Sequence, residues 1–136
     1  MIMINESVWP VAVAAIAATL IGYAWYHPRL FGALWMRLHG TTPAMAEHGA
    51  KRARLYTVLG FVSCVVVAYI MRALMIGLGI MDIVSAVRLG SYMWLGFAVP
   101  ILLGSVLWEH RPLKLYLINI GYWLCALIVM AVILVL

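Results

Sequence analysis

Four long apolar runs divide the chain, and few charged residues interrupt them. They cover residues 8–26, 55–78, 84–108 and 113–136. A helix needs about 20 mostly apolar residues to cross the hydrocarbon core of a bilayer. The runs do not alternate as the strands of a membrane barrel do, and lipid tolerates no unpaired backbone groups. The pattern therefore predicts an all-α integral membrane protein, with four transmembrane helices in a single domain, residues 1–136.

One sizeable polar stretch, residues 27–54, separates the first two runs. Within residues 28–39 the apolar side chains recur at helical spacing, so they gather on one side of a helix. These side chains are Leu30, Phe31, Leu34, Trp35 and Leu38. We therefore expect an amphipathic helix over residues 28–39 that lies in the membrane interface. Thr42 and Pro43 suit the N-cap and first position of another helix, which we expect to continue unbroken into the second span.

The charged residues indicate an orientation. The chain has a net charge of +5, with 68% hydrophobic and 10% charged residues. The first and third loops carry seven Lys and Arg residues, the second loop carries one, and the segments outside the runs at either end carry none. Basic loops stay in the cytoplasm, so both termini are expected outside it, with loop 27–54 inside. A nucleic-acid binder would need a basic face on a soluble module.

Anionic lipid headgroups are instead the expected partners of the basic residues. The expected headgroup contacts are Arg29, Arg37, Lys51, Arg52 and Arg54. Residues 1–6 contain no Lys or Arg, whereas a signal peptide begins with a positive region. The first run is therefore expected to be a retained helix.

Six polar side chains are expected at one depth, in the cytoplasmic half of the membrane. They are Tyr23, Tyr26, Ser105, Glu109, Asn119 and Tyr122. A polar group at this depth needs a hydrogen-bond partner or a wet crevice. One interpretation is a ligand site made by Tyr26, Ser105, Glu109, Asn119 and Tyr122; the other, more common arrangement is a hydrogen-bonded contact between helices. We expect Asn119 and Tyr122 to face inward, toward the end of the first or third span.

Small residues recur every fourth position on two spans. The sets are Ala14, Ala18 and Gly22 on the first span, and Gly96, Pro100 and Gly104 on the third. This spacing lets helix backbones approach closely. Packing within the chain is the favoured interpretation, because a four-helix bundle needs such contacts, and a dimer interface is the alternative. Pro100 is also expected to kink the third span.

Arg72 is the one strong charge well inside a span, near its outer end. Its long side chain could reach outer headgroups, which is the favoured interpretation. The alternative is an anion contact or a gate in which Arg72 pairs with Asp82 or Glu6.

The sequence contains no motif that would hold a metal or cofactor. The histidines are His27, His39, His48 and His110, with Glu47 and Glu109 beside two of them. Imidazole and carboxylate groups bind transition metals, but no histidine pair has the spacing of a helical zinc motif. Cys64 and Cys125 lie in apolar runs, where cysteine behaves as a small hydrophobe. We expect no metal, cofactor or disulfide, and an enzyme is the least favoured class.

Three short motifs carry a resemblance to a known family. They are Trp25-Tyr26-x-Pro28-x-x-Phe31-Gly32-x-x-Trp35, Leu103-Gly104-Ser105-x-Leu107-x-Glu109 and Asn119-x-Gly121-Tyr122. Together they resemble small bacterial membrane proteins catalogued as domain of unknown function 1761, over nearly the whole chain. The resemblance implies a four-span protein of the bacterial inner membrane and brings no activity with it.

Two classes of function therefore remain open. The first is a binding or permeation module for a small molecule or ion, which uses the polar cluster and acts as an oligomer. The alternative is a structural or accessory membrane protein that packs with a partner and binds no solute. A polar crevice with unused hydrogen-bonding groups would favour the first class, and a dry, fully paired cluster would favour the second.

Overall fold

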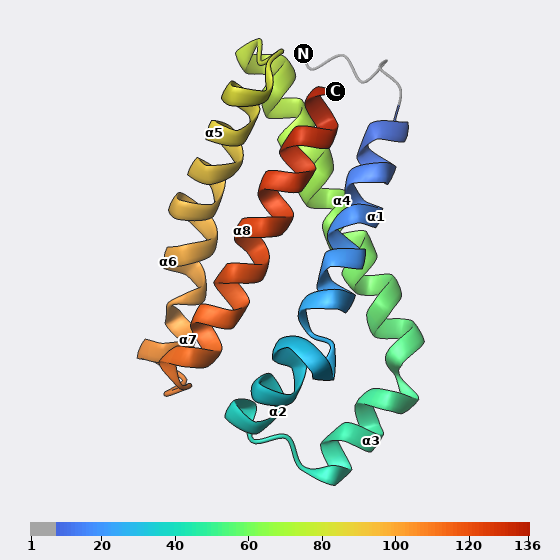
Figure 1. The fold of residues 1–136 in the computed structure, drawn as a ribbon, viewed down its shortest axis with the longest axis vertical. Helices are drawn as coiled ribbons and strands as arrows, with labels where there is room; N and C mark the ends of the chain where they lie inside the picture. The colour runs from blue at the N-terminus through green and yellow to red at the C-terminus, as the bar shows by residue number, and fades with distance from the viewer. Residues whose placement is uncertain (1–7) are drawn as a thin grey trace.

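The computed structural model describes residues 8–136, and every regular element in this range is helical. The elements are α1 (Trp9–Trp25), η1 (Pro28–Gly32), α2 (Ala33–His39), α3 (Pro43–Lys51), α4 (Ala53–Leu78), α5 (Ile83–Met93), η2 (Trp94–Ala98), α6 (Val99–Leu102), α7 (Gly104–Leu107) and α8 (Leu113–Val135). The two η elements are π-helical turns. The start of α1 and the end of α8 lie at one end, and α2, α3 and α7 lie at the other (Figure 1). The all-α prediction is confirmed.

Three segments are long and apolar enough to cross a membrane, and they correspond to the last three predicted runs. They are Ala53–Leu78, Ile83–Leu107 and Leu113–Val135. Helix α1 has only 17 residues. It qualifies as a span only together with Pro28–His39, from which it is bent by 41°. The structure thus supports three spans, or four if this bent pair crosses as one.

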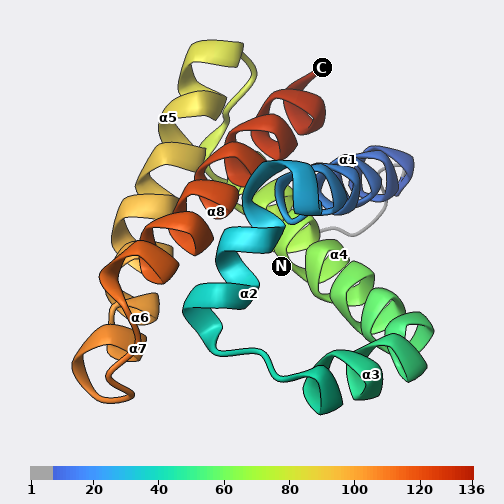
Figure 2. The same cartoon turned by 60° about the horizontal axis from the view of Figure 1, so that its bottom comes forward.

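Helix α8 lies at the centre of the fold, with α1 on one side and α5 on the other (Figures 1 and 2). Small residues make these contacts close: Ala14 and Ala18 of α1 are fully buried. A Cβ on Gly90 of α5 would lie 3.1 Å from the Leu127 carbonyl oxygen. The small residues of the first span therefore pack within the chain, as expected from their spacing.

The small residues of the third span do not pack in this way. A Cβ on Gly96 would meet nothing within 4 Å, and one on Gly104 would meet only the Trp108 side chain, at 3.8 Å. Pro100 is exposed. The expectation that this second set packs within the chain is wrong, because the face that carries it points away from α8.

The expected continuous helix from Thr42 into the second span is also wrong. Thr42 does cap α3, since its Oγ1 accepts a hydrogen bond from the Met45 amide at 3.2 Å. The helix then breaks at Arg52, whose φ of −104° and ψ of 9° are not helical. Gly49 weakens the preceding turn by about 1 kcal/mol relative to alanine, and α3 buries no residue that would hold it in line with α4.

Pro100 lies directly after the π-helical turn η2 in the third span, and the kink expected there stays a prediction. Proline offers no N–H to the carbonyl four residues earlier, and its ring clashes with that carbonyl. The turn before it widens into η2, and the helix after it divides again at Leu103, between α6 and α7. π-helical turns occur mostly as single turns inside α-helices, as here. These irregular turns lie within one apolar segment, Ile83–Leu107.

Residues 28–39 are helical, as predicted, in the two pieces η1 and α2. The ring of Phe31 lies 4.7 Å from that of Trp25, and the ring of Trp35 lies 6.2 Å from that of Tyr26. At this end α4 and α7 diverge, and α2 lies between them (Figure 2). Aromatic side chains that the sequence assigned to lipid thus contact the end of α1.

Candidate functional site

Residues of the first and third sequence motifs meet where α1 ends against α8. The Trp25 ring covers Gly121 so closely that a Cβ there would lie 2.9 Å from Trp25 Cζ2. Trp25 Nε1 donates a hydrogen bond to the Ile118 carbonyl at 3.0 Å. The hydroxyl of Tyr26 donates to Asn119 Oδ1 at 2.8 Å. The two motifs therefore form one packed unit.

The chain turns sharply after Tyr26, and Gly32 makes the turn possible. The amide of Gly32 donates to the His27 carbonyl at 3.0 Å. A Cβ on Gly32 would collide with the Tyr26 carbonyl oxygen, so no other residue fits there without moving the backbone. This turn fixes the position of the Tyr26 side chain at the end of α1.

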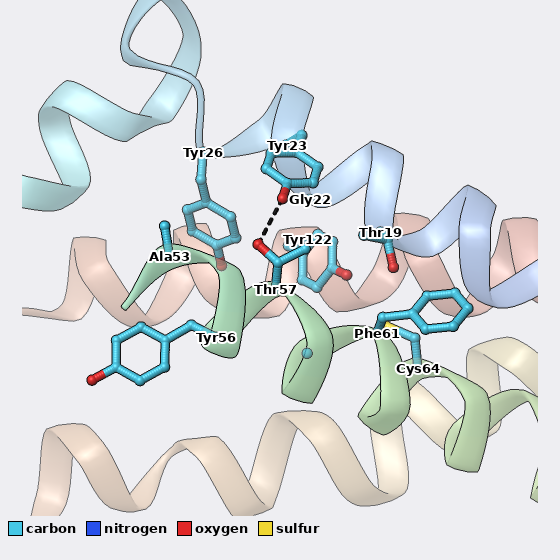
Figure 3. Close-up of a pocket in the computed structure, with 11 residues that line it drawn as sticks. Thr19, Gly22, Tyr23, Tyr26, Ala53, Tyr56, Thr57, Phe61, Cys64 and Tyr122 are labelled. Atoms are coloured by element: carbon cyan, nitrogen blue, oxygen red, sulfur yellow. Dashed lines mark hydrogen bonds between the residues drawn. The ribbon is translucent and has the colours of Figure 1, made fainter. Parts of the chain in front are cut away.

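The first crevice, called here the tyrosine crevice, has a volume of about 450 Å³ and lies between α1, α4 and α8 (Figure 3). It is lined by Thr19, Gly22, Tyr23, Tyr26, Ala53, Tyr56, Thr57, Gly60, Phe61, Cys64 and Tyr122. None of these residues carries a charge. Small-molecule sites typically occupy about 300–1,000 Å³, mostly apolar with a few polar groups. The tyrosine crevice falls in this range and has this character.

Hydroxyl groups connect the helices around the tyrosine crevice. Tyr122 donates to the Ala18 carbonyl of α1 at 3.0 Å. The Tyr23 hydroxyl and Thr57 Oγ1 lie 2.7 Å apart and join α1 to α4 (Figure 3). A hydroxyl has one proton to donate and two lone pairs that accept. The walls therefore combine aromatic rings with oxygen atoms that retain the capacity to accept hydrogen bonds.

The second crevice, called here the Asn119 crevice, has a volume of about 440 Å³ and lies under α2. It is lined by Tyr26, Gly32, Trp35, Met36 and Asn119. Tyr26 lines both crevices, and its ring lies 5.6 Å from that of Tyr122. Because the Asn119 oxygen accepts from Tyr26, its amide nitrogen is the group with donors to offer.

The structure brings together three of the five expected ligand contacts: Tyr26, Asn119 and Tyr122. Asn119 and Tyr122 both bond to the first helix or its end, so they face inward as expected. Ser105 and Glu109 line neither crevice. The Ser105 hydroxyl donates to the Leu102 carbonyl of its own segment at 2.8 Å, and Glu109 is exposed. The expectation that these two side chains join the cluster is therefore wrong, because a shared depth along the spans does not fix which side of the bundle a side chain faces.

Sequence reasoning missed the contribution of α4 to the tyrosine crevice. Ala53, Thr57, Gly60 and Cys64 recur at intervals of three and four, so they share one face of this helix. Small or polar residues at helical spacing in an otherwise apolar run were the available signal. The sequence could not predict which neighbour this face contacts, because that depends on how α4 packs against α1.

Arg72 contacts the last turn of α8. Its Nη1 donates to the Leu134 carbonyl at 3.3 Å. The sequence had suggested Asp82 or Glu6 as a partner of Arg72. Glu6 lies outside the described residues. The other, Asp82, instead caps α5, because its Oδ1 accepts from the Ser85 amide at 2.9 Å. Hydrogen bonds from Ser85 hold the pKa of Asp82 below its ordinary value.

The five expected headgroup residues, Arg29, Arg37, Lys51, Arg52 and Arg54, are all exposed. Lys51 pairs with Glu47 at 3.3 Å. The Arg111 guanidinium donates to the His39 carbonyl at 3.2 Å, which connects the third loop to the end of α2. Within residues 8–136, no group of three or more His, Cys, Asp and Glu side chains is placed to hold a metal ion.

These features define an all-helical protein with three or four segments able to cross a membrane and two aromatic-lined crevices at one end. The chain belongs to the family described as Protein of unknown function (DUF1761), whose sequence model matches residues 9–135. The resemblance inferred from the motifs is thus confirmed. No curated protein and no solved structure matches the chain.

Proposed function

We propose that this protein is a membrane-embedded binding protein whose tyrosine crevice holds a small, largely apolar molecule. The observation that carries the proposal is the crevice itself, which is lined by aromatic rings and hydroxyl groups without a charged side chain. Permeation fits less well. The lining residues lie in the last turns of α1 and the first turns of α4 and do not follow either helix along its whole length.

We also propose that the protein lies in the bacterial inner membrane. The end that carries α2, α3 and α7 then faces the cytoplasm. Seven Lys and Arg residues in the first and third loops support this orientation. Both loops lie at that end of the molecule (Figure 1). Arg29, Arg37, Lys51, Arg52 and Arg54 would then meet anionic headgroups, with the crevice mouth close to that surface.

A second class of function has its own supporting observation. Four aromatic side chains donate to main-chain carbonyls of a neighbouring segment: Trp25 to Ile118, Trp94 to Ile120, Tyr116 to Val99, and Tyr122 to Ala18. These bonds serve packing and need no ligand. The open Gly96 face of the third span would also admit another helix. On this alternative, the protein is a structural partner, of itself or of another membrane protein.

Gly60→Leu separates the two classes. Gly60 lines the tyrosine crevice, and a Cβ there meets nothing within 4 Å, so we expect a leucine side chain to be accommodated and to occupy part of the crevice. Leucine also favours a helix more than glycine does. The probe is a photoactivatable hexadecanol added to the protein in phosphatidylcholine vesicles. We expect crosslinking to the end of α1 and the start of α4 in the wild type, and its loss in Gly60→Leu without a fall in thermal stability.

Gly77→Leu is the matched control. Gly77 lies on the same helix, is equally open, and lines no part of the tyrosine crevice. This variant should be labelled as the wild type is. Equal labelling of the two variants would mean that the probe does not bind in the tyrosine crevice, and it would favour the structural class.

A further inference from the structure

The tyrosine crevice has an uncharged wall and a basic mouth. Ala53 lines the crevice where α4 begins, and its two neighbours in the chain are Arg52 and Arg54. Tyr26, which lies beside Ala53 in Figure 3, is followed by His27. No lining residue has an acidic neighbour in the chain. Basic residues and no acidic ones therefore flank the lining residues at this end of the crevice.

These two arginines are available to a ligand. Both are exposed, and within residues 8–136 neither forms an ion pair, whereas the nearby Lys51 is already paired with Glu47. Arg54 precedes Phe61 by seven residues, or about two turns, so both lie on the same side of α4. A guanidinium group binds carboxylate and phosphate groups through paired, charge-assisted hydrogen bonds.

Away from the mouth, the crevice becomes apolar. Phe61 and Cys64 lie at the end opposite Ala53 and Tyr56 (Figure 3). Cys64 is buried, and Gly60 between the two ends leaves open space. Polarity thus changes along α4, from the two exposed arginines that flank Ala53 to an aromatic ring and a thiol inside the crevice.

We infer that the ligand of the tyrosine crevice is an anionic amphiphile. Its chain lies along Gly60, Phe61 and Cys64, and its carboxylate or phosphate head lies at Arg52 and Arg54. This inference rests on the proposed function, since it names the chemical class of the molecule bound there. A free fatty acid and an anionic phospholipid share this chemistry.

The test compares two photoactivatable probes of equal chain length, hexadecyl phosphate and hexadecanol, on the intact protein in phosphatidylcholine vesicles. We expect the phosphate to label the start of α4 and the end of α1 at least about tenfold more efficiently, since each basic contact with an anionic surface contributes about fivefold. In the double variant Arg52→Gln/Arg54→Gln, this preference should disappear while hexadecanol labelling persists. Lys51→Gln, a substitution in the same loop, should keep the preference.

Equal labelling of the wild type by both probes would overturn the anionic assignment and leave the proposed function standing. Labelling by neither probe would overturn both. Because this comparison uses the wild type alone, it holds even if the double variant fails to fold. A second arm adds unlabelled phosphatidylglycerol or palmitate as competitor. Whichever competes at the lower concentration identifies the source of the anionic head, and competition by neither at concentrations that saturate the phosphate probe overturns the assignment.

Discussion

Trp25 and Tyr26 attach the end of α1 to α8 by different means, although they are adjacent in the chain. Trp25 uses its flat face against Gly121 and its ring N–H against a carbonyl, and Tyr26 uses its hydroxyl against Asn119. A buried amide or indole without a partner costs several kilocalories per mole in lipid. At the scale of single residues, Trp25 and Tyr26 therefore each donate their side-chain hydrogen to α8.

Gly121→Ala tests this contact. The added Cβ would lie 2.9 Å from Trp25 Cζ2, so the ring must shift and its hydrogen bond to Ile118 must lengthen. We expect a loss of about 1–3 kcal/mol, the usual cost of overpacking, measured as thermal unfolding in detergent. Gly60→Ala, with open space around its Cβ, should be neutral or stabilising. Trp25→Leu should reduce the cost of Gly121→Ala, and simple additivity of the two would contradict the contact.

The sequence could predict part of this site. Asn119 was expected to face the end of the first or third span because an amide inside a membrane helix needs a partner, and it accepts a hydrogen bond from Tyr26 at the end of the first span. Thr57 and Gly60 could not be assigned in the same way. A threonine bonds readily within its own helix and a glycine needs no partner, so neither side chain requires a particular neighbour until the packing of α4 on α1 is known.

At the scale of elements, long apolar runs were easier to locate than breaks. The ends of α4 and α8 fall within two residues of the predicted limits, because apolar length alone sets them. The break at Arg52 has no proline beside it, and its nearest glycine, Gly49, lies within the last turn of α3. Pro28 follows the end of α1, but the sequence could not show that the chain bends there by 41° or that α2 contacts α8.

The start of α5 depends on Asp82. Because hydrogen bonds from Ser85 lower the pKa of Asp82, its capping contribution is fully present above the ordinary aspartate pKa and is lost as pH falls through the lowered value. Asp82→Ala should speed hydrogen exchange at the first turn of α5 at neutral pH. Asp82→Asn should keep slow exchange and remove the acid-dependent step. Identical exchange in the wild type and Asp82→Ala would mean that the cap is dispensable.

At the scale of the whole molecule, charge divides the two ends. The start of α1 and the end of α8 share one end, opposite the basic loops (Figure 1). A reporter fused after Leu136 should therefore behave as periplasmic, and one inserted near Gly40 as cytoplasmic. Paired phosphatase and fluorescent-protein fusions give this readout. Reversed signals would mean that the crevice mouth faces away from the cytoplasmic leaflet, which would contradict the proposed orientation.

The central position of α8 has a consequence for how the protein is made. Helix α8 is the last of the described helices to be synthesised, yet α1 and α5 both pack against it. Before it enters the membrane, the alanine-rich face of α1 and the Gly90 face of α5 lack their main partner. Helix α1 can pack against α4 before α8 is made, whereas α5 lacks its main partner until then. A chain interrupted within α8 would leave two unjoined helical groups, which membrane quality-control proteases could recognise as unassembled.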